Sequence, residues 1–223
     1  MNAKQLAAEQ AVEHINDGMI VGLGTGSTAY WAIRSLAEKV SEGLRIRAVA
    51  SSIQSEDLAK QLGIPLIPFS ELEEIDMTID GADEVDADLN LIKGGGGALL
   101  REKILAANSK RLIIIVDESK RVERLGAFPL PVEIVPFAAN LTIRRLERLQ
   151  GKPQIRLANG EPFITDNGNW IADCSFGPIA DPAQLHLQLN MIPGVVDNGL
   201  FVQMAHQVVV GYNDGTVKII NSR

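Results

Sequence analysis

Short apolar runs alternate, along the first half of the chain, with longer stretches whose apolar residues recur at helical spacing. Each short run is typical of a buried strand, and the four clearest runs cover residues 19–23, 46–50, 77–79 and 112–116. The longer stretches predict helices over residues 4–15, 29–39, 53–62 and 98–108. Because strands that alternate with helices form parallel sheets, this half predicts an α/β fold: an open, mostly parallel sheet with helices on both faces.

The pattern changes after Gly126, where prolines and turn residues become frequent. The expected elements are a proline-interrupted strand (residues 128–136), two helices (residues 138–149 and 182–189) and two hairpins (residues 164–171 and 207–220). The first of the hairpins is indicated by an Asn-Gly pair, which is the strongest short hairpin signal. This section therefore predicts a smaller α+β domain beside the α/β sheet.

Composition limits the classes of function that remain. The chain has 223 residues, a formal net charge of −7 and a pI of about 5.0, which argue against a nucleic-acid partner or an anionic membrane surface. No apolar run approaches the roughly 20 residues of a membrane span, and the N-terminal stretch lacks the apolar core of a signal peptide. The single cysteine, Cys174, is expected to be a packed core thiol, and a cytoplasmic protein is expected. The histidines lie far apart, so no metal site is expected.

The first glycine turn, residues 24–28 with the sequence Gly-Thr-Gly-Ser-Thr, stands where a predicted strand meets a predicted helix. Its backbone N–H groups and the hydroxyls of Ser27 and Thr28 suit a phosphate. The spacing also fits the loose dinucleotide fingerprint, which needs an acidic residue about 20 positions further on. Ser51 and Ser52 stand there instead, which counts against NAD. The ordinary structural interpretation is a helix cap provided by Ser27 or Thr28.

The acidic turn, residues 80–83 with the sequence Asp-Gly-Ala-Asp, follows another predicted strand. Open parallel sheets bind their ligands at the carboxyl ends of strands. Asp80 and Asp83 could therefore act as an acid and base pair, or hold a cation. The alternative is a solvated turn in which the carboxylates bond to backbone N–H groups. Glu84 and Asp86 extend the acidic run and favour this alternative.

The glycine loop, residues 94–97, is the stretch that folding alone explains least well. Ordering four consecutive glycines costs much conformational entropy, yet their N–H groups can approach an anion closely. Lys93 precedes the loop and a predicted helix follows it, with Glu102 between Leu99 and Leu105 on the most apolar arc of that helix. Burial and a nearby ammonium influence the ionisation of a carboxyl group in opposite directions, a combination typical of a general base. A mobile loop, and a first-turn acid favoured by the helix dipole, are the alternatives.

Lys120 follows the most hydrophobic predicted strand and so belongs to the same ligand-binding edge. Its neighbour Asp117 is better interpreted as an ordinary loop charge. In their order and spacing these stretches resemble the ribose-5-phosphate isomerase family of the A type, over nearly the whole chain. The matching pieces are residues 24–28, 80–83, 93–98, 101–103, 119–120, 128–133, 165–169 and 192–195.

The resemblance implies an aldose–ketose isomerase that needs no cofactor and no metal. It would interconvert D-ribose 5-phosphate and D-ribulose 5-phosphate through an enediolate, in the non-oxidative pentose phosphate pathway, as a homodimer. The implied catalytic residues are Glu102, which moves the proton, with Asp80, Asp83 and Lys93. The implied substrate contacts are Thr25, Gly26, Ser27, Thr28, Asp80, Gly81, Ala82, Asp83, Lys93, Gly94, Gly95, Gly96 and Lys120.

The resemblance also implies that the tail rejoins the first domain. The expected α/β domain then comprises residues 1–126 and 206–223, and the smaller α+β domain comprises residues 127–205. Two questions stay open: which of Lys120, the first glycine turn and the glycine loop holds the phosphate, and how Asp80 and Asp83 divide their work.

Three other classes of protein fit parts of the pattern. An amino-sugar phosphate isomerase or deaminase, or a CoA transferase with a glutamate nucleophile, would use a related α/β scaffold. A non-catalytic sugar-phosphate sensor is the third, but such a domain normally carries a DNA-binding segment, and this acidic chain shows none.

Overall fold

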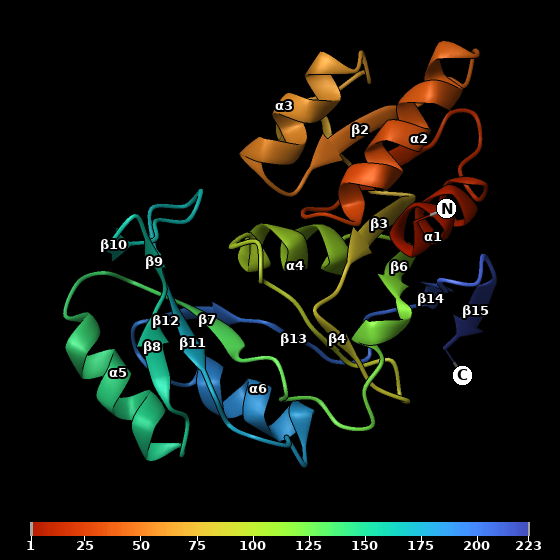
Figure 1. Ribbon diagram of the computed structural model, residues 1–223. Helices are drawn as coiled ribbons and strands as arrows, with labels where there is room; N and C mark the ends of the chain where they lie inside the picture. Colours follow the sequence, from red (N-terminus) through yellow and green to blue (C-terminus); the bar gives the residue numbers. More distant parts are fainter. Residues whose placement is uncertain (1, 223) are drawn as a thin grey trace. The chain divides into compact units, whose positions relative to one another are not determined.

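The computed structural model describes residues 2–222 and divides into two compact units (Figure 1). Within the described chain, the first unit comprises the residues up to Ala82, Arg101–Arg121 and the residues from Met204 onward. The second unit comprises Asp83–Leu100 and Val122–Gln203. The domain boundaries expected from the sequence stay a prediction, because grouping by contacts does not define a domain.

A six-stranded sheet in the order β15-β14-β6-β3-β1-β2 forms the middle of the first unit. All neighbouring strands from β14 to β2 run parallel, and β15 runs antiparallel to β14. The strands are β1 (Ile20–Leu23), β2 (Arg47–Ala50), β3 (Met77–Gly81), β6 (Leu112–Asp117), β14 (Gln207–Gly211) and β15 (Val217–Asn221). The predicted mostly parallel sheet is confirmed, and the pairing of β14 with β6 shows that the tail joins this sheet.

Helices cover both faces of this sheet, as predicted. On one face the core joins Ile113 of β6 to Ala8 of α1 and Leu36 of α2. On the other face Leu105 packs with Val49 and Ile75 in a separate cluster. Because β6 is buried on both faces, its sequence is a continuous apolar run rather than an alternating one. The helices are α1 (Ala3–Val12), α2 (Ala29–Ser41), α3 (Ile53–Gln61) and α4 (Leu99–Ala107), with the short 3₁₀ helices η1 (Phe69–Glu71) and η2 (Glu118–Lys120).

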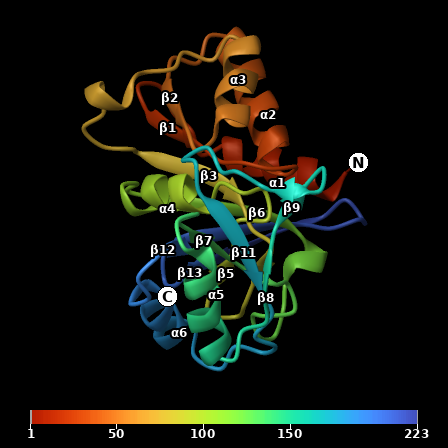
Figure 2. The same ribbon diagram turned by 90° about the vertical axis from the view of Figure 1, so that its left-hand side faces the viewer.

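The second unit contains an antiparallel sheet in the order β12-β7-β11-β8, whose strands are labelled in Figure 2. A three-stranded sheet, β13-β5-β4, and the pair β9-β10 complete its strands. The bounds are β4 (Glu84–Val85), β5 (Leu91–Ile92), β7 (Leu130–Ile134), β8 (Pro153–Ile155), β9 (Leu157–Ala158), β10 (Glu161–Pro162), β11 (Trp170–Cys174), β12 (Val195–Asn198) and β13 (Leu200–Phe201). Its helices are α5 (Ala139–Arg148) and α6 (Pro182–Asn190).

Alternation along β7 and β11 gives the antiparallel sheet two different faces. Val132 and Ala172 belong to the core that Leu146 of α5 and Leu189 of α6 complete. The residues next in line, such as Glu133, therefore point to the opposite face of the sheet. Glu133 is fully buried there, and its Oε1 accepts hydrogen bonds from the side chains of Thr165, Asn167 and Asn169. The face opposite to this core thus carries polar groups. Within residues 2–222, no helix combines the length and apolar character that crossing a membrane requires.

Candidate active site

Three of the predicted site segments follow neighbouring strands of the first unit. The first glycine turn follows β1, Asp80 and Gly81 end β3, and Lys120 belongs to η2, directly after β6. In the sheet, β6, β3 and β1 are adjacent and parallel, so their carboxyl ends lie at the same edge. A Cβ built on Gly81 would lie 3.7 Å from Cβ of Thr28, so the ends of β1 and β3 are close. The structure therefore brings these segments to the edge where parallel sheets bind ligands.

Asp80 is held by the first glycine turn. Its Oδ1 accepts hydrogen bonds from the N–H groups of Thr25, at 3.1 Å, and of Gly81, at 2.7 Å, and the residue is 1% exposed. A Cβ built on Gly24 would lie 2.2 Å from the same oxygen, so only glycine allows this approach. The first glycine turn and the acidic turn are therefore one structural arrangement, which fixes the carboxylate of Asp80.

Four buried hydroxyl groups support the first glycine turn. The Thr25 hydroxyl lies 2.8 Å from those of Ser51 and Ser52, and the Ser55 hydroxyl donates to the carbonyl of Gly24 at 2.6 Å. The Ser51 hydroxyl also donates to the carbonyl of Leu23. These serines stand where a dinucleotide enzyme would carry an acidic residue. Their contacts show that they shape the turn, a role that the sequence pattern did not indicate.

Lys4 is a second contact of this turn that sequence reasoning missed. Its Nζ donates to the Ser27 hydroxyl at 3.0 Å, although Lys4 belongs to α1 and precedes the turn by 23 residues. The side chain of Thr28, the N-cap residue of α2, makes no capping hydrogen bond within the described chain. The contact of Lys4 adds an ammonium group to a turn where Gly26 and Ser27 are exposed.

Glu102 lies in the first turn of α4 and is 5% exposed. Leu105 and Ala106, three and four residues further on, are also buried and share its side of the helix. Its neighbours Arg101 and Lys103 are only half-buried. The burial that the apolar arc predicted for Glu102 is therefore present.

Lys93, in the second unit, is a buried cation at the start of the glycine loop. The residue is 2% exposed, and its ammonium lies 5.4 Å from the centre of the Phe201 ring, within range of a cation–π interaction. Its backbone N–H donates to the carbonyl of Gly199 at 2.9 Å. Strand β5 ends one residue earlier and pairs with both β4 and β13. The position of Lys93 is thus fixed by the three-stranded sheet.

Asp83 contacts the glycine loop directly. Its Oδ2 accepts a hydrogen bond of 2.7 Å from the N–H of Gly95. A Cβ built on Gly95 would lie 2.6 Å from Oδ1, so a glycine is needed at this close approach as well. Asp83 is half-buried, whereas Gly95 and Gly96 are exposed. In the same unit Arg156, which the sequence pattern did not single out, donates to the carbonyls of Gly94 and Gly95.

Two neighbouring acids have structural contacts. Glu84 is 3% exposed and accepts hydrogen bonds from the N–H groups of Gly126 and Phe128. The interpretation of Glu84 as part of a solvated acidic run is therefore wrong, because its carboxylate holds a loop within the second unit. Asp117 caps η2 by accepting from the backbone N–H and the hydroxyl of Ser119, which agrees with the ordinary structural role expected for it.

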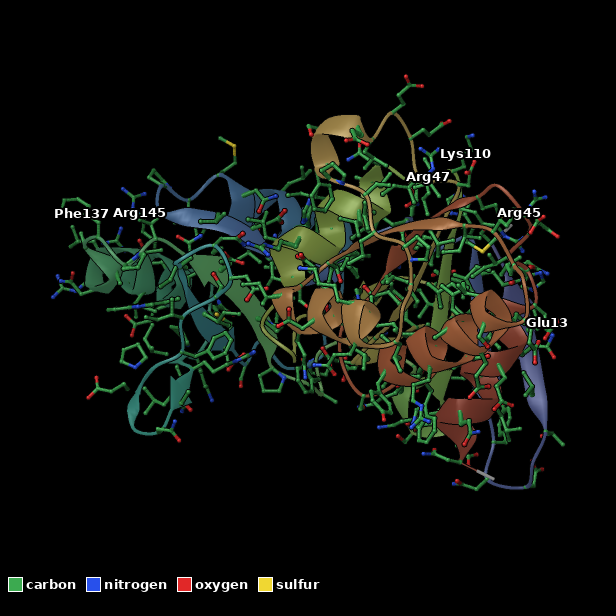
Figure 3. The ribbon with its side chains drawn as sticks, turned by 90° about the horizontal axis from the view of Figure 1, so that it is seen from above. Glu13, Arg45, Arg47, Lys110, Phe137 and Arg145 are labelled. Carbon is green, nitrogen blue, oxygen red and sulfur yellow. The ribbon has the colours of Figure 1, made fainter. Side chains whose placement is uncertain are left out.

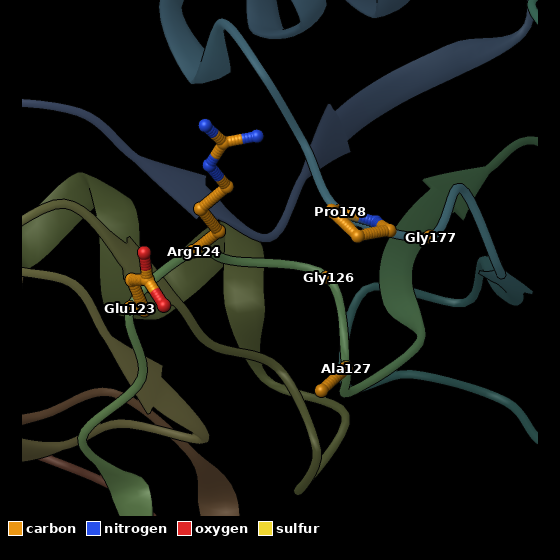
Figure 4. A pocket seen from close by; sticks show the side chains of 6 residues that line it. All are labelled: Glu123, Arg124, Gly126, Ala127, Gly177 and Pro178. Carbon is orange, nitrogen blue, oxygen red and sulfur yellow. The ribbon is translucent and has the colours of Figure 1, made fainter.

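The second unit also contains a surface hollow of about 570 Å³, shown in Figure 4. The residues around it are Glu123, Arg124, Gly126, Ala127, Gly177 and Pro178. A Cβ on Gly126 would lie 2.0 Å from the carbonyl oxygen of Gly177, so a glycine is needed where these two lining segments approach each other. These residues differ from those that the sequence analysis assigned to the site.

The first unit thus gathers Thr25, Ser27, Thr28, Asp80 and Lys120 at one edge of its sheet and buries Glu102 in α4. The second unit holds Asp83, Lys93 and the glycine loop together. In the first unit a glycine turn and a buried carboxylate lie at the edge of a parallel sheet, and in the second unit a buried ammonium precedes the glycine loop. These groups define the class: an α/β enzyme that acts on a small anionic substrate.

Comparison with known proteins identifies the family. Residues 47–215 match the sequence model of ribose 5-phosphate isomerase A (phosphoriboisomerase A). Ribose-5-phosphate isomerase A of Bacillus mycoides (strain KBAB4) is 54% identical over 216 residues, which cover 96% of this chain and 98% of that protein. The chain belongs to the ribose 5-phosphate isomerase A family.

Solved structures agree with this assignment. Ribose 5-phosphate isomerase A from Methanocaldococcus jannaschii superposes with a TM-score of 0.93 at 43% identity, covering 98% of each chain. A D-ribose-5-phosphate isomerase in complex with phospho-erythronic acid gives a TM-score of 0.95 at 41% identity, covering 99% of this chain and 100% of that one. The fold class predicted from the sequence is therefore confirmed.

Proposed function

We propose that Glu102 moves the proton in the reaction of this chain, which is the interconversion of D-ribose 5-phosphate and D-ribulose 5-phosphate. The family assigns that reaction, and with it the non-oxidative pentose phosphate pathway, to the chain. The observation that carries the role of Glu102 is its burial, at 5% exposure, in the first turn of the helix that directly follows the glycine loop. Buried carboxylates in such places are frequent at functional sites, where burial and neighbouring charges adjust their basicity.

The reaction needs one base that serves two neighbouring carbons. Glu102 takes the proton from C2 of the open-chain aldose, the electron pair of that bond forms the C1–C2 double bond of an enediolate, and the pair of the C1 carbonyl moves onto O1. Glu102 then returns the proton to C1, while O2, which has lost its hydroxyl proton, becomes the carbonyl of the ketose and O1 is protonated. General base catalysis of this kind contributes about 10²–10⁴-fold, or roughly 3–5 kcal/mol.

The enediolate needs stabilisation for the negative charge that develops on its oxygen. Lys93 supplies an ammonium group whose position is fixed by burial, and the glycine loop supplies the N–H of Gly96, since those of Gly95 and Gly97 donate within the protein. The relative in complex with phospho-erythronic acid supports this proposal, because the carboxylate of that acid is planar and negatively charged, as the enediolate is. The proposal requires Lys93 and Glu102 to act on the same substrate molecule.

Asp80 and Asp83 handle ring opening and the protons of the O1 and O2 hydroxyls. Their surroundings suggest a division of this work. Asp80 is 1% exposed and is fixed by two N–H groups, which suits a residue that orients a substrate hydroxyl. Asp83 is half-buried, which suits a residue that exchanges protons with water.

The phosphate binds at the first glycine turn. This turn offers exposed N–H and hydroxyl groups, and the contact between Lys4 and Ser27 adds a positive charge. Lys120, in η2 of the same unit, stands at the same edge of the sheet and provides a second ammonium. Assigning the phosphate to this turn leaves the glycine loop for the reacting end of the sugar.

Glu102→Gln tests the role of Glu102, because it keeps the size of the side chain and removes its basicity. We expect kcat to fall by about 10²-fold or more, with KM changed much less. Glu38→Gln is the matched control, since Glu38 is an exposed acid on α2 of the same unit. A Glu102→Gln enzyme that folds normally and keeps wild-type turnover would exclude Glu102 as the base.

The chain forms a homodimer, and the apolar side chains that the second unit exposes support this proposal. Phe137 is 86% exposed, and Figure 3 shows it projecting from the end of its unit. Leu141, Leu187 and Met191 are also exposed to more than half of their surface. Exposed apolar side chains of this size are frequent at interfaces between subunits. Sedimentation equilibrium should give twice the chain mass of 24.1 kDa, and a value equal to that mass would contradict the dimer.

The enzyme works in the cytoplasm. A single buried thiol and the absence of cysteine pairs suit a reducing compartment. Fractionation of the source cells should recover the isomerase activity with cytosolic markers, and recovery with an exported fraction would contradict this location.

A further inference from the structure

Arg156, between β8 and β9 of the second unit, reaches the glycine loop from a distant part of the sequence. Its Nη1 donates to the carbonyl oxygens of Gly94 and Gly95, both at 3.0 Å. The sequence separation is 62 residues from Gly94, so the contact depends on tertiary folding. One nitrogen of Arg156 therefore holds two successive carbonyls of the loop.

Asp173 fixes the direction of this guanidinium. Its two carboxylate oxygens accept from Nε at 2.9 Å and from Nη2 at 2.6 Å, the two-point geometry that arginine forms with carboxylates. The side chains are only 17% and 27% exposed, and Asp173 belongs to β11, which is paired on both sides. The Phe163 ring lies 5.9 Å from the guanidinium carbon. Because Asp173 occupies one edge of the guanidinium, Nη1 is left to serve the loop.

The contacts of Arg156 determine which way the loop N–H groups point. In a trans peptide the carbonyl of one residue and the N–H of the next point in opposite directions. With the Gly94 carbonyl turned to Arg156, the Gly95 N–H points away from it, and this N–H is the donor to Asp83. The Gly95 carbonyl is also turned to Arg156, so the Gly96 N–H points away from the guanidinium as well. Both residues are exposed.

We propose that Arg156, oriented by Asp173, is a positioning residue that aims the N–H of Gly96 at the oxyanion of the enediolate, while the N–H of Gly95 holds Asp83. This inference rests on the proposed function, which assigns oxyanion stabilisation to the loop. In this role Arg156 acts through the loop and not on the substrate itself. Its effect is to hold two peptide planes in the orientation that the transition state needs, before substrate binds.

A purely structural role makes different predictions. If Arg156 only linked the glycine loop to the β9–β10 hairpin, its loss would lower the free energy of unfolding, and it would not lower kcat selectively over KM. A positioning role lowers kcat selectively, because an oxyanion hole acts on the transition state more than on the bound substrate. In the positioning role the geometry of the guanidinium matters, because a lysine would provide the charge without the planar arrangement of N–H donors.

The test compares Arg156→Lys, Asp173→Asn and the double variant in steady-state kinetics with ribose 5-phosphate. We expect Arg156→Lys to lower kcat about 10- to 100-fold with KM within about threefold of wild type. Asp173→Asn should lower kcat less, and the double variant should be no worse than Arg156→Lys, because both changes act on one contact. Arg145→Lys is the matched control, on an exposed arginine of α5 that Figure 3 labels. It should keep the wild-type kcat.

Chemical rescue keeps the proposal testable if the substitutions disturb folding. Arg156→Ala should regain activity when methylguanidinium is added, and methylammonium at the same concentration should give no rescue. Unchanged kcat in Arg156→Lys, or rescue by both cations alike, would overturn the positioning role. Glu102→Gln is assayed in the same series. If Glu102→Gln is inactive while the Arg156 variants keep the wild-type kcat, only the inference about Arg156 fails. If Glu102→Gln is fully active, the proposed function fails.

Discussion

The N–H of Gly95 donates a hydrogen bond of 2.7 Å to the carboxylate of Asp83, twelve residues earlier in the chain. This bond joins the last residue of the acidic turn to the glycine loop. It gives Asp83 a fixed orientation, and it gives the loop an anchor on the side opposite to Arg156. Two motifs that are separate in the sequence thus form one structure.

Gly95→Ala should disturb this structure, because the new Cβ would lie 2.6 Å from Oδ1 of Asp83. The loop or the carboxylate must then move, and a displacement of about 1 Å at a reacting group can cost 10²-fold in rate. We expect kcat/KM to fall by about that factor. In a protein that already carries Asp83→Ala, Gly95→Ala should lower the free energy of unfolding less than it does in wild type, because the steric clash is gone. An equal loss of unfolding free energy in both proteins would show that the contact with Asp83 is not the cause.

Ser55→Ala should destabilise the first glycine turn. The buried Ser55 hydroxyl donates to the carbonyl of Gly24 at 2.6 Å, and its loss leaves that buried carbonyl without this donor. An unsatisfied buried group costs about 1–3 kcal/mol of folding free energy, measured here by urea unfolding. Ser41→Ala is the control, because the Ser41 hydroxyl bonds to a carbonyl at the exposed end of α2. Equal free energies of unfolding for Ser55→Ala and Ser41→Ala would contradict the account of the hydroxyl cluster.

Lys4→Gln tests where the phosphate binds. A charged hydrogen bond to phosphate contributes about 1.5 kcal/mol or more, so KM for ribose 5-phosphate should rise about tenfold. Turnover of unphosphorylated D-ribose should not change, since that sugar lacks the group in question. Lys218→Gln, on the exposed surface of β15, should leave both values unchanged. An unchanged KM in Lys4→Gln would place the phosphate elsewhere.

Cys174 gives the stability a pH dependence. The residue is fully buried, and burial raises the pKa of its thiol to about 12 from an ordinary value of 9.0. Between these values the unfolded chain loses the proton while the folded protein keeps it, so stability is complete below pH 9 and falls as the pH rises. The slope is about 1.4 kcal/mol per pH unit.

Cys174→Ala isolates this effect, because other alkaline titrations are common to both proteins. The difference in unfolding free energy between wild type and Cys174→Ala, measured by urea titration, should shrink by about 2 kcal/mol between pH 9 and pH 10.5. A difference that stays constant over this range would show that the thiol ionises as easily in the folded protein as in the unfolded chain.

Local sequence was sufficient where a feature depends on a few neighbouring residues. The parallel sheet followed from short apolar runs, and the burial of Glu102 followed from the apolar arc of its own helix. Lys4 and Arg156 could not be found in this way. Their partners lie 23 and 62 residues away, and only tertiary folding brings a lysine of α1 to Ser27 or a guanidinium to Gly94.

Turn chemistry was predicted only in part. The Asn167-Gly168 pair does form a tight turn, closed by the N–H of Thr165 on the carbonyl of Asn169. The two-residue hairpin of this region is instead at Asn159 and Gly160, between the paired strands β9 and β10. A side-chain acceptor explains the difference, because Glu133 binds Thr165 and Asn169 and holds the turn from a distant strand.

Isomerisation of ribose 5-phosphate in D₂O, followed by NMR, tests the central claim most directly. Wild-type enzyme should form ribulose 5-phosphate, part of which carries deuterium at C1. The deuterium enters when the proton on Glu102 exchanges with solvent before it is returned to the substrate. Glu102→Gln should give neither ribulose 5-phosphate nor deuterium at C2 of the substrate in the time that wild type needs for equilibrium. If Glu102→Gln introduces deuterium at the wild-type rate, another group carries the proton and the role of Glu102 is wrong.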